Sequence, residues 1–253
     1  MRRRWIRLPF LLLALVFLFP ARAYAQEPQE PQEPPEPHFI GETLRFTMTI
    51  MGVTGGELVL AAKATRLEGK PAYKLEMSAL SNEFLSKIFL VRDYLASWVD
   101  PSSFRSLRFE KHTVEGKRVR DELIEFDYAQ GVARRENGKT IEIDDRTFDS
   151  LSSVYYLRTL DLDVGTPVEI DVVAKKRFFL RIEFQGRETV TTPAGVFRTI
   201  RVEPKSAGEG GLISKGQNLV LWLTDDERKM PVQLRSKLKV GTLVGKLKSL
   251  ERR

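Results

Sequence analysis

The sequence predicts a mainly β protein, with a single large antiparallel sheet curved into a barrel or half-barrel around one buried helix. Three observations support this fold class. Most of the chain after residue 38 alternates apolar and polar residues with the period of a half-buried strand. Glycine-containing turns separate these stretches. Thr147–Leu160 is the strongest helical stretch.

Residues 1–25 have the pattern of an export signal. Arginines at positions 2–4 and 7 precede the apolar run Leu8–Phe19, and Ala23-Tyr24-Ala25 offers a cleavage site after Ala25. As a helix this run spans roughly 20 Å, less than the ~30 Å hydrocarbon core of a bilayer. We therefore expect a cleaved signal, no stable transmembrane anchor and a periplasmic location. General secretory and twin-arginine export both remain open.

Repeated Gln-Glu-Pro units fill Gln26–Pro37. Proline at this density favours extended polyproline II, so we interpret residues 26–38 as a linker and residues 39–253 as one β domain. A recognition arm for a proline-binding partner is the alternative.

Cysteine and charge exclude several classes of protein. The chain has no cysteine, which excludes disulfides, Cys-bound metals and the lipid-modified cysteine of a lipoprotein. The net charge is +7, but residues 1–25 hold five arginines and no acid. The remaining 36 basic and 34 acidic residues give +2, which does not favour nucleic-acid binding.

The domain opens with a predicted hairpin. Apolar residues at positions 44, 46, 48 and 50 form one face of a strand, Gly52–Gly56 forms the turn, and Glu57–Arg66 returns. Further strands are predicted at Tyr73–Ala79, Tyr94–Val99, Ser106–Val114, Arg118–Asp127 and around Asn137-Gly138. Between them, Ser81–Val91 breaks the alternation, and we expect a short helix capped by Ser81 or Asn82.

The helical stretch Thr147–Leu160 starts at a cap provided by Thr147 or Asp149 and is apolar nearly all round, so we expect it to be buried. Strands are predicted after it at Val168–Val173, Arg177–Phe184, Glu188–Thr192, Val196–Glu203, Leu219–Leu223, Pro231–Val240 and Thr242–Leu250. Lys205–Gly216 is predicted to be a flexible loop. Roughly a dozen strands joined by short turns pair antiparallel, and a sheet this wide curls or splits.

Several segments, in order, resemble the DUF3108 family of exported bacterial proteins of unknown function. They are GETLRFTMTIMGVTGGELVL, YLASWVDPSSF, FDSLSSVYYLR, TTPAGVFRTIRVEP and LWLTDDERKMPVQLRSKLKVGTLVGKL. The resemblance covers about Gly41–Leu250. It implies one continuous β-rich domain in the bacterial envelope, and it brings no catalytic residues.

The sequence contains few residues that could form a catalytic site. Only His38 and His112 are present, so a histidine-based triad or multi-histidine metal site lacks parts, and we expect neither catalysis nor a cofactor. The acidic run Asp225–Glu227 offers oxygen ligands for calcium, but Arg228 and Lys229 favour a solvated turn.

Candidate binding residues depend on whether a cavity exists. Arg158 lies near the apolar stripe of the helix, where a buried arginine needs a carboxylate or carbonyl partner, so structural pairing is favoured over ligand contact. If a cavity exists, its predicted lining is Tyr155, Tyr156, Arg158 and Trp222. The loop Gly208–Gly211 could gate its entrance.

Lys175–Arg177, beside two phenylalanines, could meet lipid phosphates, although a solvated turn is favoured.

The sequence as a whole leaves two hypotheses for the function of the protein. The leading hypothesis is a non-enzymatic periplasmic protein that binds a hydrophobic or lipid-like envelope ligand. The alternative is an envelope assembly or scaffold protein that binds another protein through a folded head on an extended linker.

Overall fold

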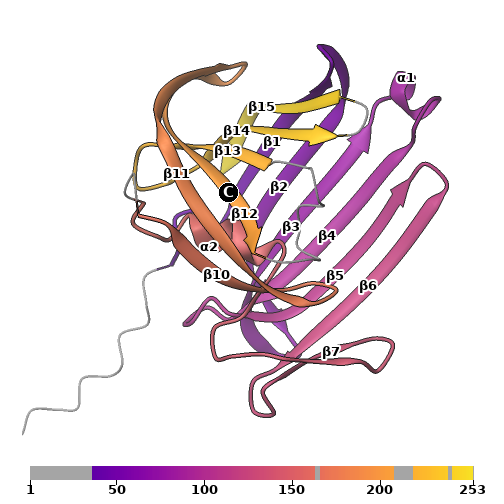
Figure 1. The fold of residues 1–253 in the computed structure, drawn as a ribbon, viewed down its shortest axis with the longest axis vertical. Coiled ribbons are helices and arrows are strands. Elements are labelled where there is room, and N and C mark those ends of the chain that lie inside the picture. Colours follow the sequence, from indigo (N-terminus) through magenta and orange to yellow (C-terminus); the bar gives the residue numbers. More distant parts are fainter. Residues whose placement is uncertain (1–35, 163–165, 208–218, 239–240, 253) are drawn as a thin grey trace, which may run out of the picture. The chain divides into compact units, whose positions relative to one another are not determined.

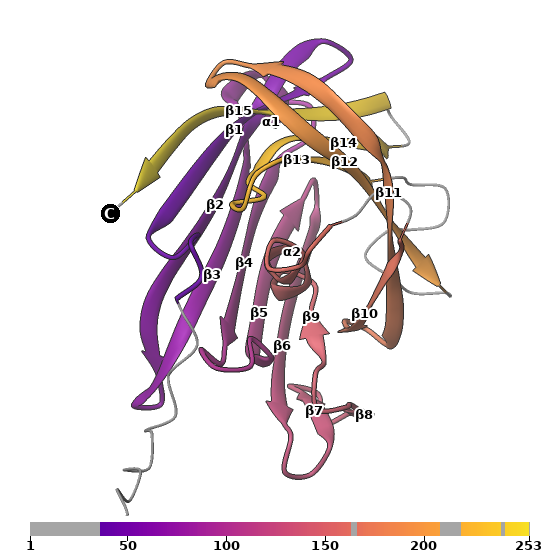
Figure 2. The same cartoon turned by 90° about the vertical axis from the view of Figure 1, so that its left-hand side faces the viewer.

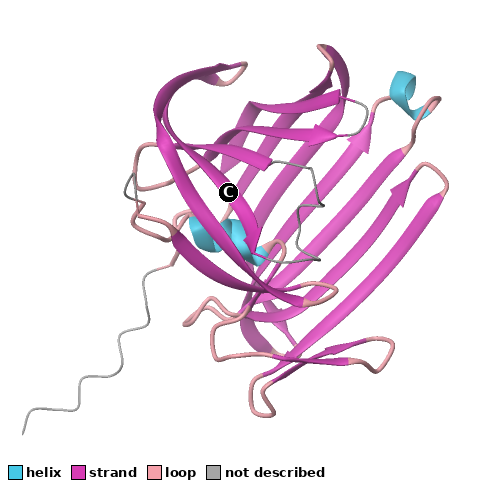
Figure 3. Cartoon of the chain, viewed as in Figure 1, coloured by secondary structure: helices cyan, strands magenta, loops and turns pink. Residues whose placement is uncertain are grey.

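The strands predicted from alternation join into one sheet. The computed structural model describes residues 36–162, 166–207, 219–238 and 241–252, and within them the sheet has fifteen strands (Figures 1 and 3). Their bounds are β1 (Glu42–Ile50), β2 (Val53–Leu67), β3 (Lys70–Ser81), β4 (Val91–Val99), β5 (Ser106–Glu115), β6 (Arg118–Asp127), β7 (Val132–Arg135), β8 (Thr140–Glu142), β9 (Phe148–Asp149), β10 (Val168–Val173), β11 (Arg177–Thr192), β12 (Gly195–Ala207), β13 (Leu219–Thr224), β14 (Pro231–Leu238) and β15 (Gly241–Arg252). The helices are α1 (Glu83–Ser86) and α2 (Ser152–Leu157). The predicted signal, most of the linker and the Gly208–Gly211 loop lie outside the described residues.

The first and last strands of the chain meet in the middle of the sheet. The order is β8-β7-β6-β5-β4-β3-β2-β1-β15-β14-β13-β12-β11-β10-β9. All neighbouring pairs are antiparallel except β9 and β10, which are parallel. Figure 2 shows the sheet curving around α2. The mainly β structure and the single large sheet are as predicted, but the sheet is not closed into a barrel, because β8 and β9 remain its two edges.

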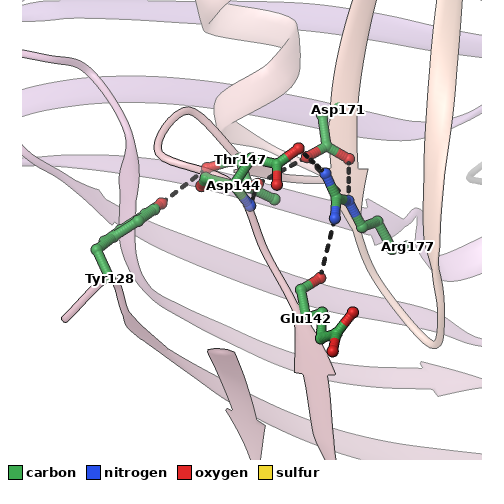
Figure 4. Close-up of polar contacts among 6 residues, drawn as sticks. All are labelled: Tyr128, Glu142, Asp144, Thr147, Asp171 and Arg177. Carbon is green, nitrogen blue, oxygen red and sulfur yellow. Dashed lines mark hydrogen bonds and ion pairs between the residues drawn. The ribbon is translucent and has the colours of Figure 1, made fainter. Parts of the chain in front are cut away.

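Side-chain contacts connect the two edges of the sheet, which are not joined by hydrogen bonds between strands (Figure 4). The Tyr128 hydroxyl lies 2.9 Å from the carbonyl oxygen of Thr147, just before β9. Thr147 Oγ1 donates to Asp171 Oδ2 on β10 at 2.7 Å. Arg177 of β11 contacts Asp171 Oδ1 at 2.9 Å and also pairs with Asp144, which follows β8. These contacts hold the edges together although β8 and β9 do not pair.

The predicted helix over Thr147–Leu160 is too long. Phe148 and Asp149 instead form β9, opposite residues 172 and 173 of β10. The Asp149 carboxylate accepts hydrogen bonds from the backbone N–H groups of Leu151 and Ser152, at 2.8 and 2.9 Å, so the helix begins only after it. Four of the six residues of α2 are buried.

One further local feature differs from the prediction, and a second matches it. Residues 177–184 and 188–192 belong to one strand, β11, with a bulge between Phe184 and Gly186. The short helix α1 begins as expected, because Asn82 Oδ1 accepts from Leu85 N at 2.8 Å. Neither helix in the described residues has the length and hydrophobicity needed to cross a bilayer.

The main core lies between the concave face of the sheet and α2. Phe46 of β1 lies opposite Leu58 of β2 and Leu247 of β15, and all three are buried. From α2, Tyr155 contacts Phe39 with ring centroids 5.2 Å apart. This packing fills one half of the concave face and leaves the other half, beside α1, for a pocket.

Candidate ligand-binding site

An apolar pocket of about 540 Å³ lies at the end of the sheet that carries α1. Six strands, α1 and the loop after α1 contribute to its wall. The lining residues are Met48, Ile50, Met51, Gly55, Gly56, Glu57, Ala79, Leu80, Ser81, Leu85, Ile88, Phe89, Val91, Leu238 and Leu243. Eleven of these fifteen carry apolar side chains, so the pocket matches a hydrophobic ligand in chemistry.

Two glycines lie opposite Met48, a residue of the pocket wall, at matching register positions. Met48 of β1 lies opposite Gly56 of β2 on one side and Gly245 of β15 on the other. A Cβ atom at Gly56 would lie 2.1 Å from the carbonyl oxygen of Leu80, and one at Gly245 would lie 2.7 Å from Met48 Sδ. A side chain at Gly56 would therefore collide with the backbone of β3, whereas at Gly245 the side chains of Met48 and Leu234 would have to move.

The helix α1 borders the pocket. Asn82 N donates to the Gly55 carbonyl oxygen and Asn82 Nδ2 to the Thr54 carbonyl oxygen, both at 2.7 Å, which fixes the start of α1 on β2. Leu85 then lines the pocket from α1. Ile88 in the following loop also lines it, yet 72% of Ile88 is exposed. The pocket thus opens to solvent beside an apolar border.

Beyond β3 the concave face becomes polar. Ala79, Asp93 and Thr113 are consecutive cross-strand partners on β3, β4 and β5. Burial, followed by the charge of Glu115, raises the pKa of Asp93. Among the described residues, Asp93 Oδ1 and Thr113 Oγ1 are buried without a hydrogen-bond partner. An amphipathic ligand would therefore find polar atoms next to the apolar wall.

The predicted lining residues lie elsewhere. Tyr155 and Arg158 come together around Phe39, and the Arg158 guanidinium lies 4.9 Å from the Phe39 ring centroid. Arg158 pairs with Glu42, as the structural interpretation expected. Tyr156 stacks on residue 148, with centroids 4.3 Å apart. None of these residues lines the 540 Å³ pocket, and their role in ligand binding stays a prediction.

Trp222 is separated from those three residues by the sheet. It alternates with Leu221 and Leu223 on β13 and therefore points to the opposite face. There its Nε1 donates to Glu188 Oε1 at 2.7 Å, and the Arg235 guanidinium lies 5.4 Å from its ring centroid. The indole is almost fully buried and its polar atom is satisfied.

A buried polar cluster anchors α2 to the sheet. Asp149 Oδ2 accepts hydrogen bonds from Ser97 Oγ on β4 at 2.5 Å and from Ser106 Oγ on β5 at 2.7 Å. Ser106 Oγ also lies 2.8 Å from Ser152 Oγ on α2. Burial raises the pKa of Asp149, and the hydrogen bonds partly oppose this effect. Because all four residues are buried, the cluster joins elements and does not meet solvent.

The other polar candidates are structural contacts on the surface. Asp226 contacts Thr224 Oγ1 at 2.6 Å and Arg228 at 2.6 Å, as expected of a turn. His112 contacts Asp121 at 2.6 Å with both side chains more than half exposed. In the described residues, no group of three or more His, Cys, Asp or Glu side chains could hold a metal ion.

The pocket residues on and after α1 were not predicted from the sequence. Their signal was present: Ser81–Val91 breaks the alternation and holds six apolar residues, of which only two lie in the four-residue helix. A helix this short cannot bury all of them, so some must border a groove or remain exposed.

Comparisons with known proteins identify the family and the fold. The family model described as "Protein of unknown function (DUF3108)" matches residues 45–248. No curated protein matches the sequence. The β-barrel-like protein of the domain of unknown function DUF1849 from Brucella abortus is similar in structure, with a TM-score of 0.58 at 9% identity, covering 85% of this chain and 98% of that one. A Bacteroides fragilis protein with a YmcC-like fold has a TM-score of 0.34 at 13% identity, covering 86% and 98%.

Proposed function

The chain belongs to the DUF3108 family of proteins of unknown function, and we propose that it is an exported, non-enzymatic binding protein for a hydrophobic or lipid-like ligand of the bacterial envelope. The observation that carries the proposal is the apolar pocket of about 540 Å³ between α1 and the concave face of the sheet. Its volume falls within the range of roughly 300–1,000 Å³ that is typical of small-molecule sites.

The lining favours a ligand with an acyl chain. The pocket wall contains only two polar side chains, Glu57 and Ser81, and each methylene moved from water into such a wall contributes about 0.8 kcal/mol. A polar head group would fit beside Asp93 and Thr113, which continue the same concave face. If so, Thr113→Val should weaken binding of a lysophospholipid more than binding of an apolar dye.

Export is supported by the pattern of residues 1–25, a basic segment, an apolar run and small residues before position 26. An acyl-chain carrier is useful where free lipids must cross water, and the periplasm is such a compartment. The non-enzymatic part of the proposal rests on the sequence, which has only two histidines and no cysteine for catalysis.

Lipid extraction tests the proposal. The protein is purified without detergent and its bound lipids are identified by mass spectrometry, alongside Ala79→Trp, which fills the pocket, and Ala64→Trp, which places the same side chain at an exposed site on β2. We expect acyl lipids in the wild type and in Ala64→Trp, and a loss in Ala79→Trp. Absence of lipid from the wild type, together with no binding of N-phenyl-1-naphthylamine, would refute the proposal.

An envelope scaffold that binds another protein is the second candidate function. The exposed apolar residues Phe84 and Ile88 beside the pocket favour it, since such residues also occur at protein interfaces. Cross-linking in envelope fractions separates the two functions: one stoichiometric protein partner that is lost in Phe84→Ser, with an empty pocket, supports the scaffold.

A further inference from the structure

Large exposed apolar residues gather at the pocket end of the molecule. Five of them form what we call the apolar rim: Met51 (77% exposed), Val53 (54%), Phe84 (63%), Ile88 (72%) and Phe89 (48%). They come from the β1–β2 turn and the first residue of β2, from α1 and from the loop that follows α1. The hydrogen bonds from Asn82 to β2 hold α1 against that hairpin, and in Figures 1 and 2 both lie at the same end.

Exposed cations surround the apolar rim. Four of them, which we call the basic collar, are Arg92, Lys117, Arg118 and Lys237. Lys117 and Arg118 follow Gly116, whose N–H donates to the Leu90 carbonyl oxygen at 2.7 Å, and a Cβ atom at Gly116 would lie 3.0 Å from the Phe89 ring. In the part of the chain that the structure describes, none of the four has an ion-pair partner.

The acidic residues nearby do not cancel the collar. Glu83 pairs with Lys87 at 3.9 Å, and Glu115 pairs with Arg120 at 3.0 Å, so both acids already have a cation of their own. The four cations of the basic collar therefore give this end of the molecule an excess of positive charge. A partner that covers it should be apolar in its interior and negative at its surface.

We propose that this end of the molecule docks on the surface of an anionic phospholipid bilayer. The apolar rim enters the interfacial region, the basic collar meets lipid phosphates, and the pocket mouth faces the acyl chains. This inference rests on the proposed function and deepens it, because it makes the bilayer the source of the ligand. Apolar side chains and nearby cations together are what interfacial binding requires, since one contributes burial and the other electrostatic attraction.

Vesicle flotation tests the docking. The full chain is mixed with vesicles of phosphatidylcholine alone or of phosphatidylcholine with phosphatidylglycerol. Two variants remove the docking groups without touching the pocket wall: Val53→Ser with Phe84→Ser, and Lys117→Glu with Arg118→Glu. Their matched controls are Val196→Ser with Leu250→Ser, exposed by 67% and 38% elsewhere, and Lys70→Glu with Lys139→Glu, two exposed lysines at the β2–β3 and β7–β8 connections. Every protein keeps the same N-terminal segment, so the differences between variants report on the rim and collar.

We expect the wild type to bind anionic vesicles more tightly than neutral ones by about tenfold or more, in line with several surface cations acting together. Binding should weaken as salt rises from about 0.1 M to about 1 M, because the Debye length falls from about 10 Å to about 3 Å. Both docking variants should lose about tenfold or more, and both controls should retain binding. Equal losses in variants and controls, or no vesicle binding by the wild type, would overturn the proposal.

Two further measurements, of the oligomeric state and of dye uptake, separate membrane docking from the other outcomes. A dimer of the wild type that Val53→Ser with Phe84→Ser dissociates would assign the rim to a second copy and refute membrane docking. Uptake of N-phenyl-1-naphthylamine without vesicles reports on the pocket alone. If the dye binds and vesicles do not, docking fails while the proposed function survives; if neither binds, both fail.

Discussion

Arg158 and Glu42 form a buried ion pair that joins the end of α2 to the start of β1. Arg158 Nη1 lies 2.9 Å from Glu42 Oε1, and the two side chains are 2% and 3% exposed. Arg158 Nε also donates to the carbonyl oxygen of Arg228 at 3.3 Å. The pair and this hydrogen bond therefore connect three segments that are far apart in the sequence.

Breaking this pair on one side should be costly. Arg158→Met leaves the Glu42 carboxylate buried without its cation, and we expect the free energy of unfolding to fall by about 3–5 kcal/mol. Arg158→Met combined with Glu42→Leu removes both charges and should recover most of that loss. Urea denaturation at neutral pH measures both, with Arg120→Met at the exposed Glu115 pair as a control that changes by less than about 1 kcal/mol. A single-variant loss no larger than the control would show that the pair does not hold α2.

Asp149 should make the stability depend on pH in an unusual direction. Burial raises its pKa above the ordinary 3.8, so the folded state favours the protonated acid. Its stabilising contribution is present below pH 3.8 and is lost as pH rises through the raised pKa. Asp149→Asn does not titrate, so its stability relative to the wild type should increase over that interval and then level off. Unfolding curves from acid to neutral pH test this; a constant difference would contradict it.

Glu76 should make the stability depend on pH in the direction opposite to that of Asp149. Burial alone would raise its pKa, but hydrogen bonds from Lys63, Tyr94 and Lys74 lower it to about 2. The stabilising contribution of this carboxylate is therefore present above pH 4.5 and is lost as pH falls toward 2. Since the group is partly exposed, we expect Glu76→Gln to cost less than about 1 kcal/mol at neutral pH and nothing near pH 2. The same unfolding series measures it, and a cost that persists at pH 2 would rule out titration as its origin.

The local alternation of apolar and polar residues predicted the strands. The features that it did not predict depend on contacts between residues far apart in the sequence. Alternation located the β1–β2 hairpin, and the predicted strand at Leu219–Leu223 forms β13, between β12 and β14. The helix over Thr147–Leu160 was too long because Asp149 bonds to Ser97 and Ser106, which are 52 and 43 residues away. No local period records those partners.

The pocket was missed for the same physical reason. Its wall is built from six strands that are far apart in the sequence, and Met48, for example, lies opposite Gly56 of β2 and Gly245 of β15, which are nearly 190 residues apart. Alternation predicts which face each residue occupies, but not which residues of other strands lie beside it. Trp222 illustrates the limit: an aromatic residue in an apolar run suggested a lining position, and the register places it on the other face of the sheet.

Gly56 should tolerate no side chain. In Gly56→Ala the new Cβ would lie 2.1 Å from the backbone oxygen of Leu80, so β2 and β3 would have to separate. We expect a loss of about 3 kcal/mol or more in the free energy of unfolding, in the range of severe core substitutions. Gly52→Ala is the control, because its Cβ meets no atom within 4 Å and only the positive φ of 83° is strained, at about 1–2 kcal/mol. Similar losses in both would mean that the close approach of β2 and β3 is not limiting.

The pocket volume should set the preferred length of an acyl chain. Each methylene that enters the apolar wall contributes about 0.8 kcal/mol, which is about fourfold in affinity, until the chain fills the available 540 Å³. Calorimetry with a series of saturated fatty acids should therefore show affinity rising with length and then levelling off. Val91→Trp narrows the pocket and should move the plateau to a shorter chain, whereas Val119→Trp, at a 59% exposed site outside the lining, should leave it in place. An affinity that ignores chain length, or a plateau that Val91→Trp does not move, would place the ligand somewhere other than this pocket.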